Sequence, residues 1–277
     1  MKKPTQFIVF ALLLVSKLAF SAESDAENKN SGFDFNPIVI DSKDGIGATV
    51  GIEYKFNGEL LSKDFDSKDS GASFNPNIAI GSAVVSYSGS GTVAVSKVRN
   101  PKNFLEFLLD AKLRYSAPRA GSVTGGLFSK YETDQSFSNK QLVYGLGATY
   151  GKYAALAAND FVALDANYGR VDPKDDSERK TAIGTTTLDS YYRWNLEFLY
   201  MYPLNWKTVR TVEFNYRYFL ENNAPSAIKS AGLDKHELAT LRVGLKNDLF
   251  IAYSTGKLPF DRKNDNIFQI GFSYKLN

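Results

Sequence analysis

The chain has one histidine, His236, and no cysteine, so its options for side-chain chemistry are few. Hydrolases that act on lipids commonly pair a serine with a histidine base that an acid or an amide holds in place. His236 alternates with Leu238, Thr240 and Arg242, which would face inward, and no serine adjoins it in sequence. We therefore expect His236 to be an ordinary residue of the inner face and not a catalytic base, and we expect the protein not to be an enzyme. Lipid hydrolysis stays one of three functional hypotheses.

A second candidate set consists of charged residues that occupy alternate positions within otherwise apolar stretches. We predict that they line an interior: Glu106, Asp110, Lys112, Arg114, Arg193, Glu197, Glu213, Arg217, Arg242 and Lys246. Their signs are mixed, whereas an anion-selective pore would favour Arg and Lys with few acids. Two interpretations stay open: a narrow water-filled pore with opposed charged walls, or an interior filled by ion pairs that conducts little. No cofactor and no metal site is expected.

The elements that would position these residues are strands, because apolar and polar residues alternate with a period of two along most of the chain. In the segment 104–116, Leu105, Phe107 and Leu109 share one face, while Glu106 and Asp110 share the other. The same pattern predicts twelve strands, with a turn at 88–91 between the second and the third: 46–56, 78–87, 92–98, 104–116, 122–131, 140–150, 160–169, 189–202, 207–220, 235–247, 249–256 and 266–276. We expect Glu213 to face Arg242 across two of them.

The fold class that follows is all-β, a closed antiparallel transmembrane β-barrel of about twelve strands that covers 45–277. Strands with an apolar band outside and a polar lining inside suit a membrane barrel. No segment has 18 continuous apolar residues, and an open sheet edge cannot lie in lipid. Long connections such as 57–77, 170–188 and 221–234 alternate with short ones, with one exception, the brief connection 99–103. This alternation predicts long loops outside and both termini in the periplasm. A soluble periplasmic β-protein is the alternative.

The first residues predict a secretory leader. Met1-Lys2-Lys3 is a short basic start, and an apolar run of about ten residues follows, too short to span a bilayer. We predict a signal peptide at 1–21, cleaved near Ser21 or Ala22, and a polar periplasmic segment at 22–44. Without the three lysines of the leader, 30 basic and 30 acidic residues remain, so the charge indicates no nucleic-acid partner.

The last predicted strand, 266–276, resembles the closing strand of Gram-negative outer-membrane β-barrel proteins, a porin-like class. Those proteins end in alternating aromatic residues that signal to the barrel assembly machinery, and here Phe268, Phe272 and Tyr274 keep the alternation. The chain departs from the pattern by ending Leu276-Asn277. The resemblance implies a location in the cell outer membrane, with membrane lipid and the assembly machinery as partners.

Three functions remain in competition. The first is a narrow channel for ions or small polar solutes with a mixed-charge lumen. The second is a structural or ligand- or partner-binding barrel with a plugged lumen, whose long loops meet the partner. The third is the outer-membrane lipid hydrolase discussed above, which depends on His236.

Overall fold

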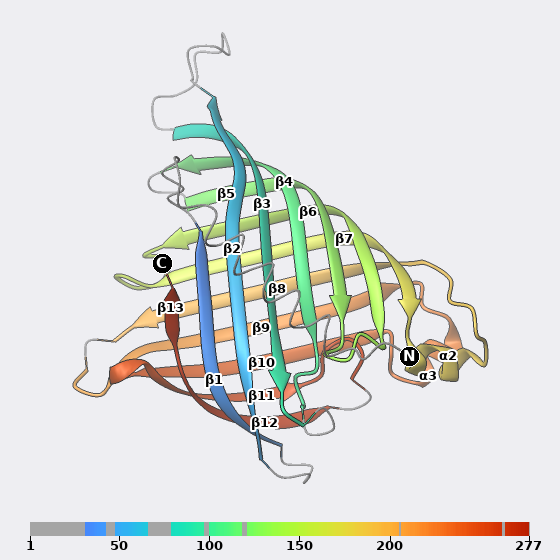
Figure 1. Cartoon of the computed structure of the whole chain (residues 1–277). Coiled ribbons are helices and arrows are strands. Elements are labelled where there is room, and N and C mark those ends of the chain that lie inside the picture. Colours follow the sequence, from blue (N-terminus) through green and yellow to red (C-terminus); the bar gives the residue numbers. More distant parts are fainter. Residues whose placement is uncertain are drawn as a thin grey trace.

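The computed structural model describes residues 31–42, 48–65, 79–96, 100–117, 121–204, 206–261 and 264–276. The predicted leader at 1–21 and its cleavage site lie outside these residues. Nearly all described elements are long strands (Figure 1): β1 (Gly32–Ser42), β2 (Thr49–Phe65), β3 (Ala79–Ala94), β4 (Leu105–Ala117), β5 (Gly121–Thr133), β6 (Lys140–Tyr153), β7 (Phe161–Asp175), β8 (Tyr191–Pro203), β9 (Val209–Asn222), β10 (Lys235–Leu245), β11 (Leu249–Gly256), β12 (Asp265–Phe272) and β13 (Tyr274–Leu276).

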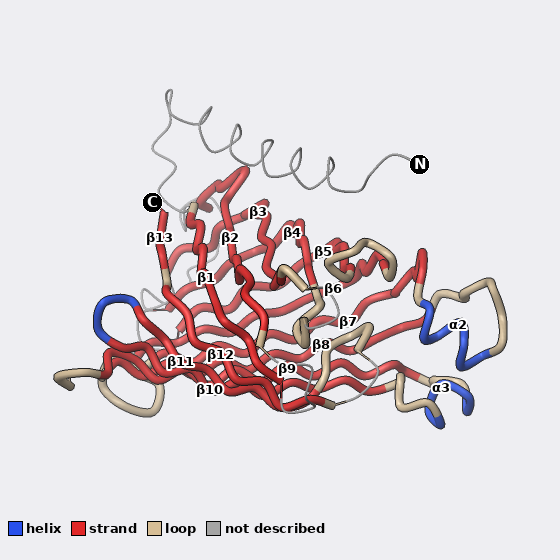
Figure 2. Tube along the Cα trace, turned by 60° about the horizontal axis from the view of Figure 1, so that its bottom comes forward, coloured by secondary structure: helices blue, strands red, loops and turns tan. Residues whose placement is uncertain are grey.

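The strands form one closed antiparallel barrel (Figure 2). From β1 to β12 each strand pairs with the next in sequence, and β1 closes the ring by pairing with β12 and β13 on its other side. β12 and β13 are one strand interrupted at Ser273, so the barrel has twelve strands. The predicted fold class is confirmed.

The predicted strand count was right because two errors compensated. β1 lies within 22–44, which was predicted to be a polar segment outside the barrel. Its alternation was obscured because it contains Pro37 and because its inward residues Ile38 and Ile40 are apolar. The predicted strands 78–87 and 92–98 are a single strand, β3, that runs through the expected turn.

The Ser-Gly run at 88–91 has the composition of a turn, but in the barrel it is part of β3. A Cβ at Gly89 would overlap the ring of Phe56, and one at Gly91 would overlap the side chain of Leu105. These glycines therefore make room for neighbouring side chains, as glycine in a strand often does.

The two barrel ends differ in their connections. We call one end the loop end; its described connecting residues are 95–96, 100–104, 134–139, 176–190, 223–234, 257–261 and 264, with the short helices α2 (Ser177–Ile183) and α3 (Ser226–Ser230). The other is the terminal end, where β1 begins and β13 ends. Its described connecting residues are 154–160, 204, 206–208 and 246–248, the last forming the 3-10 turn η2 (Lys246–Asp248).

The prediction that 57–77 is a loop at the outer end is wrong. β2 continues to Phe65 and leaves the barrel at the terminal end, since it is the second strand and not the first.

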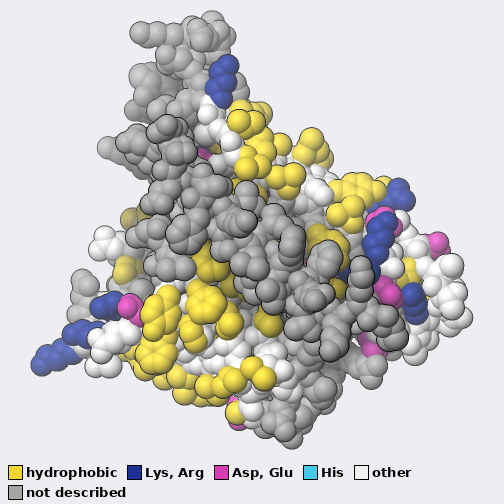
Figure 3. Space-filling model, viewed as in Figure 1, with side chains coloured by type: hydrophobic (Ala, Val, Ile, Leu, Met, Phe, Trp, Pro, Cys, Tyr) yellow, Lys and Arg dark blue, Asp and Glu magenta, His cyan; other side chains and the backbone are white. Residues whose placement is uncertain are grey.

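The outer face of the barrel is apolar. Leu109, Leu113, Leu127, Leu146 and Leu164 are among the large side chains exposed on it, and Figure 3 shows hydrophobic side chains gathered on its visible part. Near the loop end an aromatic group of Tyr168, Tyr192 and Trp194 joins this face, with ring centroids 4.7 to 5.6 Å apart. An apolar outer band with aromatic rims is what lipid contact requires. No helix in the described ranges is long and apolar enough to cross a bilayer.

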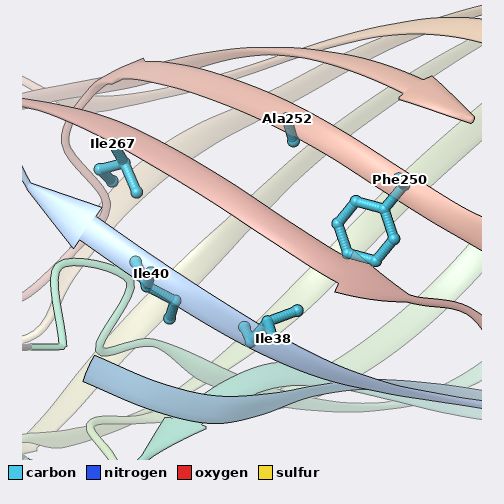
Figure 4. Close-up of a cluster of buried hydrophobic side chains, with 5 residues drawn as sticks. All are labelled: Ile38, Ile40, Phe250, Ala252 and Ile267. Carbon is cyan, nitrogen blue, oxygen red and sulfur yellow. The ribbon is translucent and has the colours of Figure 1, made fainter. Parts of the chain in front are cut away.

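An apolar cluster supports the closing seam from inside (Figure 4). Ile38 and Ile40 of β1 meet Phe250 and Ala252 of β11 and Ile267 of β12, and each is at most 4% exposed. The cluster spans β12, the strand that closes the ring against β1. Burial of these side chains adds apolar contacts to the backbone hydrogen bonds of the seam.

We expect Gly145→Ala to destabilise the barrel by about 1–3 kcal/mol, the usual cost of forcing atoms into a filled space. A Cβ at Gly145 would overlap the backbone carbonyl oxygen of Tyr168 on β7, and backbone cannot move aside without breaking the strand pairing. Gly125→Ala is the matched control, because its nearest neighbour would be 3.7 Å away. Urea unfolding in detergent micelles measures both variants, and equal stabilities would contradict the expectation.

Candidate functional site

The lumen is the candidate site, and it collects nearly all of the predicted lining residues. Strand parity, burial and contacts place nine of the ten on the inner face: Glu106, Asp110, Lys112 and Arg114 on β4, Arg193 and Glu197 on β8, Glu213 and Arg217 on β9, and Arg242 on β10. Their role in lining a pore stays a prediction.

Lys246 is the exception, and its predicted place on a strand is wrong. β10 ends at Leu245, after an irregularity in its pairing with β9, and Lys246 lies exposed in η2 at the terminal end. The turn begins one residue earlier than expected because Asn247 and Asp248 both adopt positive φ angles, of 62° and 61°.

Among the described residues, three ion pairs cross the interior between strands that lie on different walls of the barrel. Arg217 of β9 donates two hydrogen bonds, of 3.0 and 2.9 Å, to Glu106 of β4; Arg242 of β10 lies 3.0 Å from Glu53 of β2; and Arg193 of β8 lies 2.7 Å from Glu132 of β5. β4 and β9 are five strands apart in a ring of twelve, so the first pair joins almost opposite walls.

Other ion pairs stay on one wall. Lys112 lies 2.9 Å from Asp110, two residues away on β4, and Arg114 lies 3.1 Å from Glu59 of β2. The charges of the lumen are therefore largely compensated within the lumen itself.

Glu213 faces Arg242 as predicted, because the two residues are direct register partners across β9 and β10. The ion pair of Arg242 nevertheless goes to Glu53 across the lumen, and its guanidinium lies 3.6 Å from the ring centroid of Phe250. Strand register alone did not identify the partner, because a long side chain in a closed barrel reaches strands that are distant in sequence.

A segment missed by the sequence analysis, residues 100–104, folds into the lumen from the loop end; we call it the inserted segment. The Lys102 ammonium donates a 2.6 Å hydrogen bond to Gln269 Oε1 on β12. The ring of Phe104 packs on Phe219 of β9 and Phe260, with centroids 6.3 and 6.1 Å away. The predicted connection 99–103 covers most of this segment. The sequence feature that could have indicated an insertion into the lumen is Phe104, an aromatic residue directly before β4.

The inserted segment is held in place at its base. Asn100 Nδ2 donates to the carbonyl oxygen of Thr92, at 3.0 Å, and to Gln135 Oε1. Gln135 also accepts from the N–H of Ala94 and donates to the carbonyl oxygen of the same residue. These contacts tie the segment to β3 and to the neighbouring connection 134–139.

The two halves of the lumen differ in how far they are filled. Near the loop end Glu132 and Arg193 are 0% and 4% exposed. Toward the terminal end the side chains of Arg114 and Glu197 are 41% and 42% exposed. A cavity of about 520 Å³ lies beside β1 to β4, lined by Asn57, Glu59, Ser86, Ser88 and Arg114 among others. The terminal half is therefore open to water, and the loop half is closed.

His236 lies buried on the inner side of β10, where it lines a cavity of about 20 Å³ together with Tyr191 and Arg179. No hydrogen bond joins it to a serine among the residues with described positions, and it does not face lipid. This geometry gives no support to the hydrolase hypothesis.

The loop end of this small cavity is closed by a bidentate ion pair. Arg179 of α2 donates hydrogen bonds of 2.6 and 2.7 Å to Glu221 at the end of β9. Burial alone would lower the pKa of Arg179, but the hydrogen bonds and charge of Glu221 outweigh it and hold the pKa above its usual value. Arg179 therefore stays charged, and its two hydrogen bonds to Glu221 fix α2 over the barrel mouth.

A closed antiparallel barrel with an apolar exterior and a charged, polar interior defines the class of the outer-membrane β-barrels. No family model and no curated protein matches the sequence. Among solved structures, the NanC porin is similar with a TM-score of 0.48 and 9% identity, covering 88% of this chain and 100% of that one.

Two further structures show the same kind of similarity. The KdgM porin has a TM-score of 0.38 and 10% identity, over 87% of this chain and 99% of that one. The translocator domain of the autotransporter NalP from Neisseria meningitidis has a TM-score of 0.32 and 10% identity, over 98% and 97%. Similarities of this strength carry no functional assignment.

Proposed function

We propose that this protein is a narrow channel for ions or small polar solutes in the outer membrane of a Gram-negative bacterium. The loop end would lie outside and both termini in the periplasm, with membrane lipid and the barrel assembly machinery as partners. The observation that supports this most is the water-accessible, polar terminal half of the lumen, which narrows toward a closure made of side chains and the inserted segment. Side chains and short segments rearrange far more easily than a folded plug domain.

The compensated charges of the lumen predict weak selectivity between anions and cations. Acids and bases alternate along the walls and pair across the interior, so neither sign of ion meets a continuous row of opposite charge. In a salt gradient across a planar bilayer, the reversal potential should lie close to zero. A strongly positive or negative potential would show that one set of charges dominates the path.

Conductance of the purified protein in planar bilayers tests the proposal itself. Small, discrete and infrequent steps are expected, because the closure must rearrange before solutes pass. Refolded protein that shows the heat-dependent gel mobility of a barrel, yet no steps over a wide range of voltages, would contradict the channel.

A permanently filled barrel that binds a partner through its loops is the second candidate. The three cross-lumen ion pairs favour it, since paired charges that fill an interior leave little room for solutes. Here shortening the connections 176–190 and 223–234, which carry α2 and α3, should abolish partner binding and leave the barrel folded. Conductance of the unmodified chain separates this candidate from the channel.

A further inference from the structure

The pair of Arg217 and Glu106 differs from the other cross-lumen pairs, because each partner has a second partner of opposite charge on its own wall. Glu106 accepts a 2.9 Å hydrogen bond from the Ser90 hydroxyl and a 3.2 Å hydrogen bond from the Lys130 ammonium. On the opposite wall, Arg217 Nε lies 3.8 Å from Glu197 Oε2. Glu106 would therefore remain compensated if Arg217 moved away, and so would Arg217.

Glu197 is placed so that it could form a closer ion pair with Arg217 than the present 3.8 Å contact. It is the direct register partner of Arg217 on the neighbouring strand. Asn215 Nδ2 donates a 2.6 Å hydrogen bond to Glu197 Oε1, which orients the carboxylate and leaves Oε2 toward the guanidinium. Its side chain is 42% exposed, so it has room to turn.

The pair of Arg193 and Glu132 has no such freedom. Both side chains are at most 4% exposed. Besides Glu132, Arg193 makes a side-chain hydrogen bond to the neutral Asn195, and Gln141 donates to Glu132. Separating this pair would leave a buried charge without its ion-pair partner, which is strongly unfavourable.

Resting on the channel function proposed above, we propose that Arg217 is the latch of the lumen. Its guanidinium bridges to Glu106 in the closed state, and it turns back to Glu197 on its own wall in the open state. The exchange replaces one ion pair by another, so neither state leaves a charge unpaired. In the open state no side chain of this pair crosses the lumen.

The same movement would loosen the inserted segment. The Arg217 guanidinium lies 5.5 Å from the ring centroid of Phe104 and 5.3 Å from that of Phe219, within the range of cation–π attraction. Arg217 thus contacts both the opposite wall and the aromatic residue that anchors the inserted segment. When Arg217 exchanges Glu106 for Glu197, both the cross-lumen ion pair and the contact with the inserted segment change.

Three substitutions of similar size separate this latch from a general effect of charge. Glu106→Gln weakens the closed-state partner, Glu197→Gln weakens the open-state partner, and Glu237→Gln removes a carboxylate on the outer face of β10, where it pairs with Lys235. Single-channel recordings in about 1 M KCl reduce remote charge effects, because the Debye length is then about 3 Å.

We expect the open fraction to rise severalfold in Glu106→Gln, to fall severalfold in Glu197→Gln and to stay unchanged in Glu237→Gln. Heat-dependent gel mobility confirms that each variant is folded. If the unmodified protein conducts but Glu106→Gln and Glu197→Gln change in the same direction, or not at all, the latch is overturned and the channel stands. If the folded unmodified protein is silent over a wide range of voltages, the channel and the latch both fail.

Discussion

Replacing Arg193 by methionine should lower the free energy of unfolding by about 3–5 kcal/mol, the usual cost of breaking a buried ion pair. Arg193 donates hydrogen bonds of 2.7 and 2.8 Å to the two carboxylate oxygens of Glu132, which is 0% exposed. Without the guanidinium, this carboxylate would keep the 2.6 Å hydrogen bond from Gln141 Nε2 but would have no ion-pair partner among the described residues. Urea unfolding in micelles, followed by the fluorescence of the two tryptophans, measures the loss.

Two controls show whether the loss comes from the uncompensated charge. Arg193→Met combined with Glu132→Met removes both charges and should be more stable than Arg193→Met alone. Arg114→Met breaks a pair whose arginine is 41% exposed, and such pairs contribute about 0–1 kcal/mol. A double variant no more stable than the single one would show that the loss comes from packing.

Phe104→Ala should raise the single-channel conductance severalfold, because the ring anchors the inserted segment inside the lumen. Phe104 is 3% exposed and belongs to an apolar cluster with Phe219, Leu238 and Leu258. Loss of the ring leaves the segment with the bond from Lys102 to Gln269 and the contacts at its base. Conductance in planar bilayers is the readout, and Lys102→Ala should act in the same direction.

The matched control is Phe107→Ala, three positions further along the chain. Phe107 lies on the outer face of β4 and is 36% exposed toward lipid, so its loss should not change the conductance. Truncation of a buried phenylalanine costs about 3–5 kcal/mol, so the folded state of Phe104→Ala is checked by gel mobility. An unchanged conductance in folded Phe104→Ala would mean that the inserted segment does not limit the path.

The sequence by itself determined the barrel class and the face of most strands. Alternation at 104–116 and 189–202 places every second residue on one side, and a period of two does not depend on distant contacts. The alternation therefore predicted correctly that Glu106 and Arg193 face inward and that Phe107 faces outward. It failed where an inward face is apolar, as in β1, and where inward serines alternate with glycines, as in β3, because polarity then no longer marks the side.

Only the tertiary structure decided which charges meet. Local pairing predicts neighbours in register, such as Glu213 and Arg242, but the closure of the ring brings β4 opposite β9 and β2 within reach of β10. The inserted segment is likewise a property of the closed ring, since Lys102 finds Gln269 at a separation of 167 residues. The composition of the lumen can thus be read from the sequence, whereas its closure depends on contacts across the lumen that no local pattern encodes.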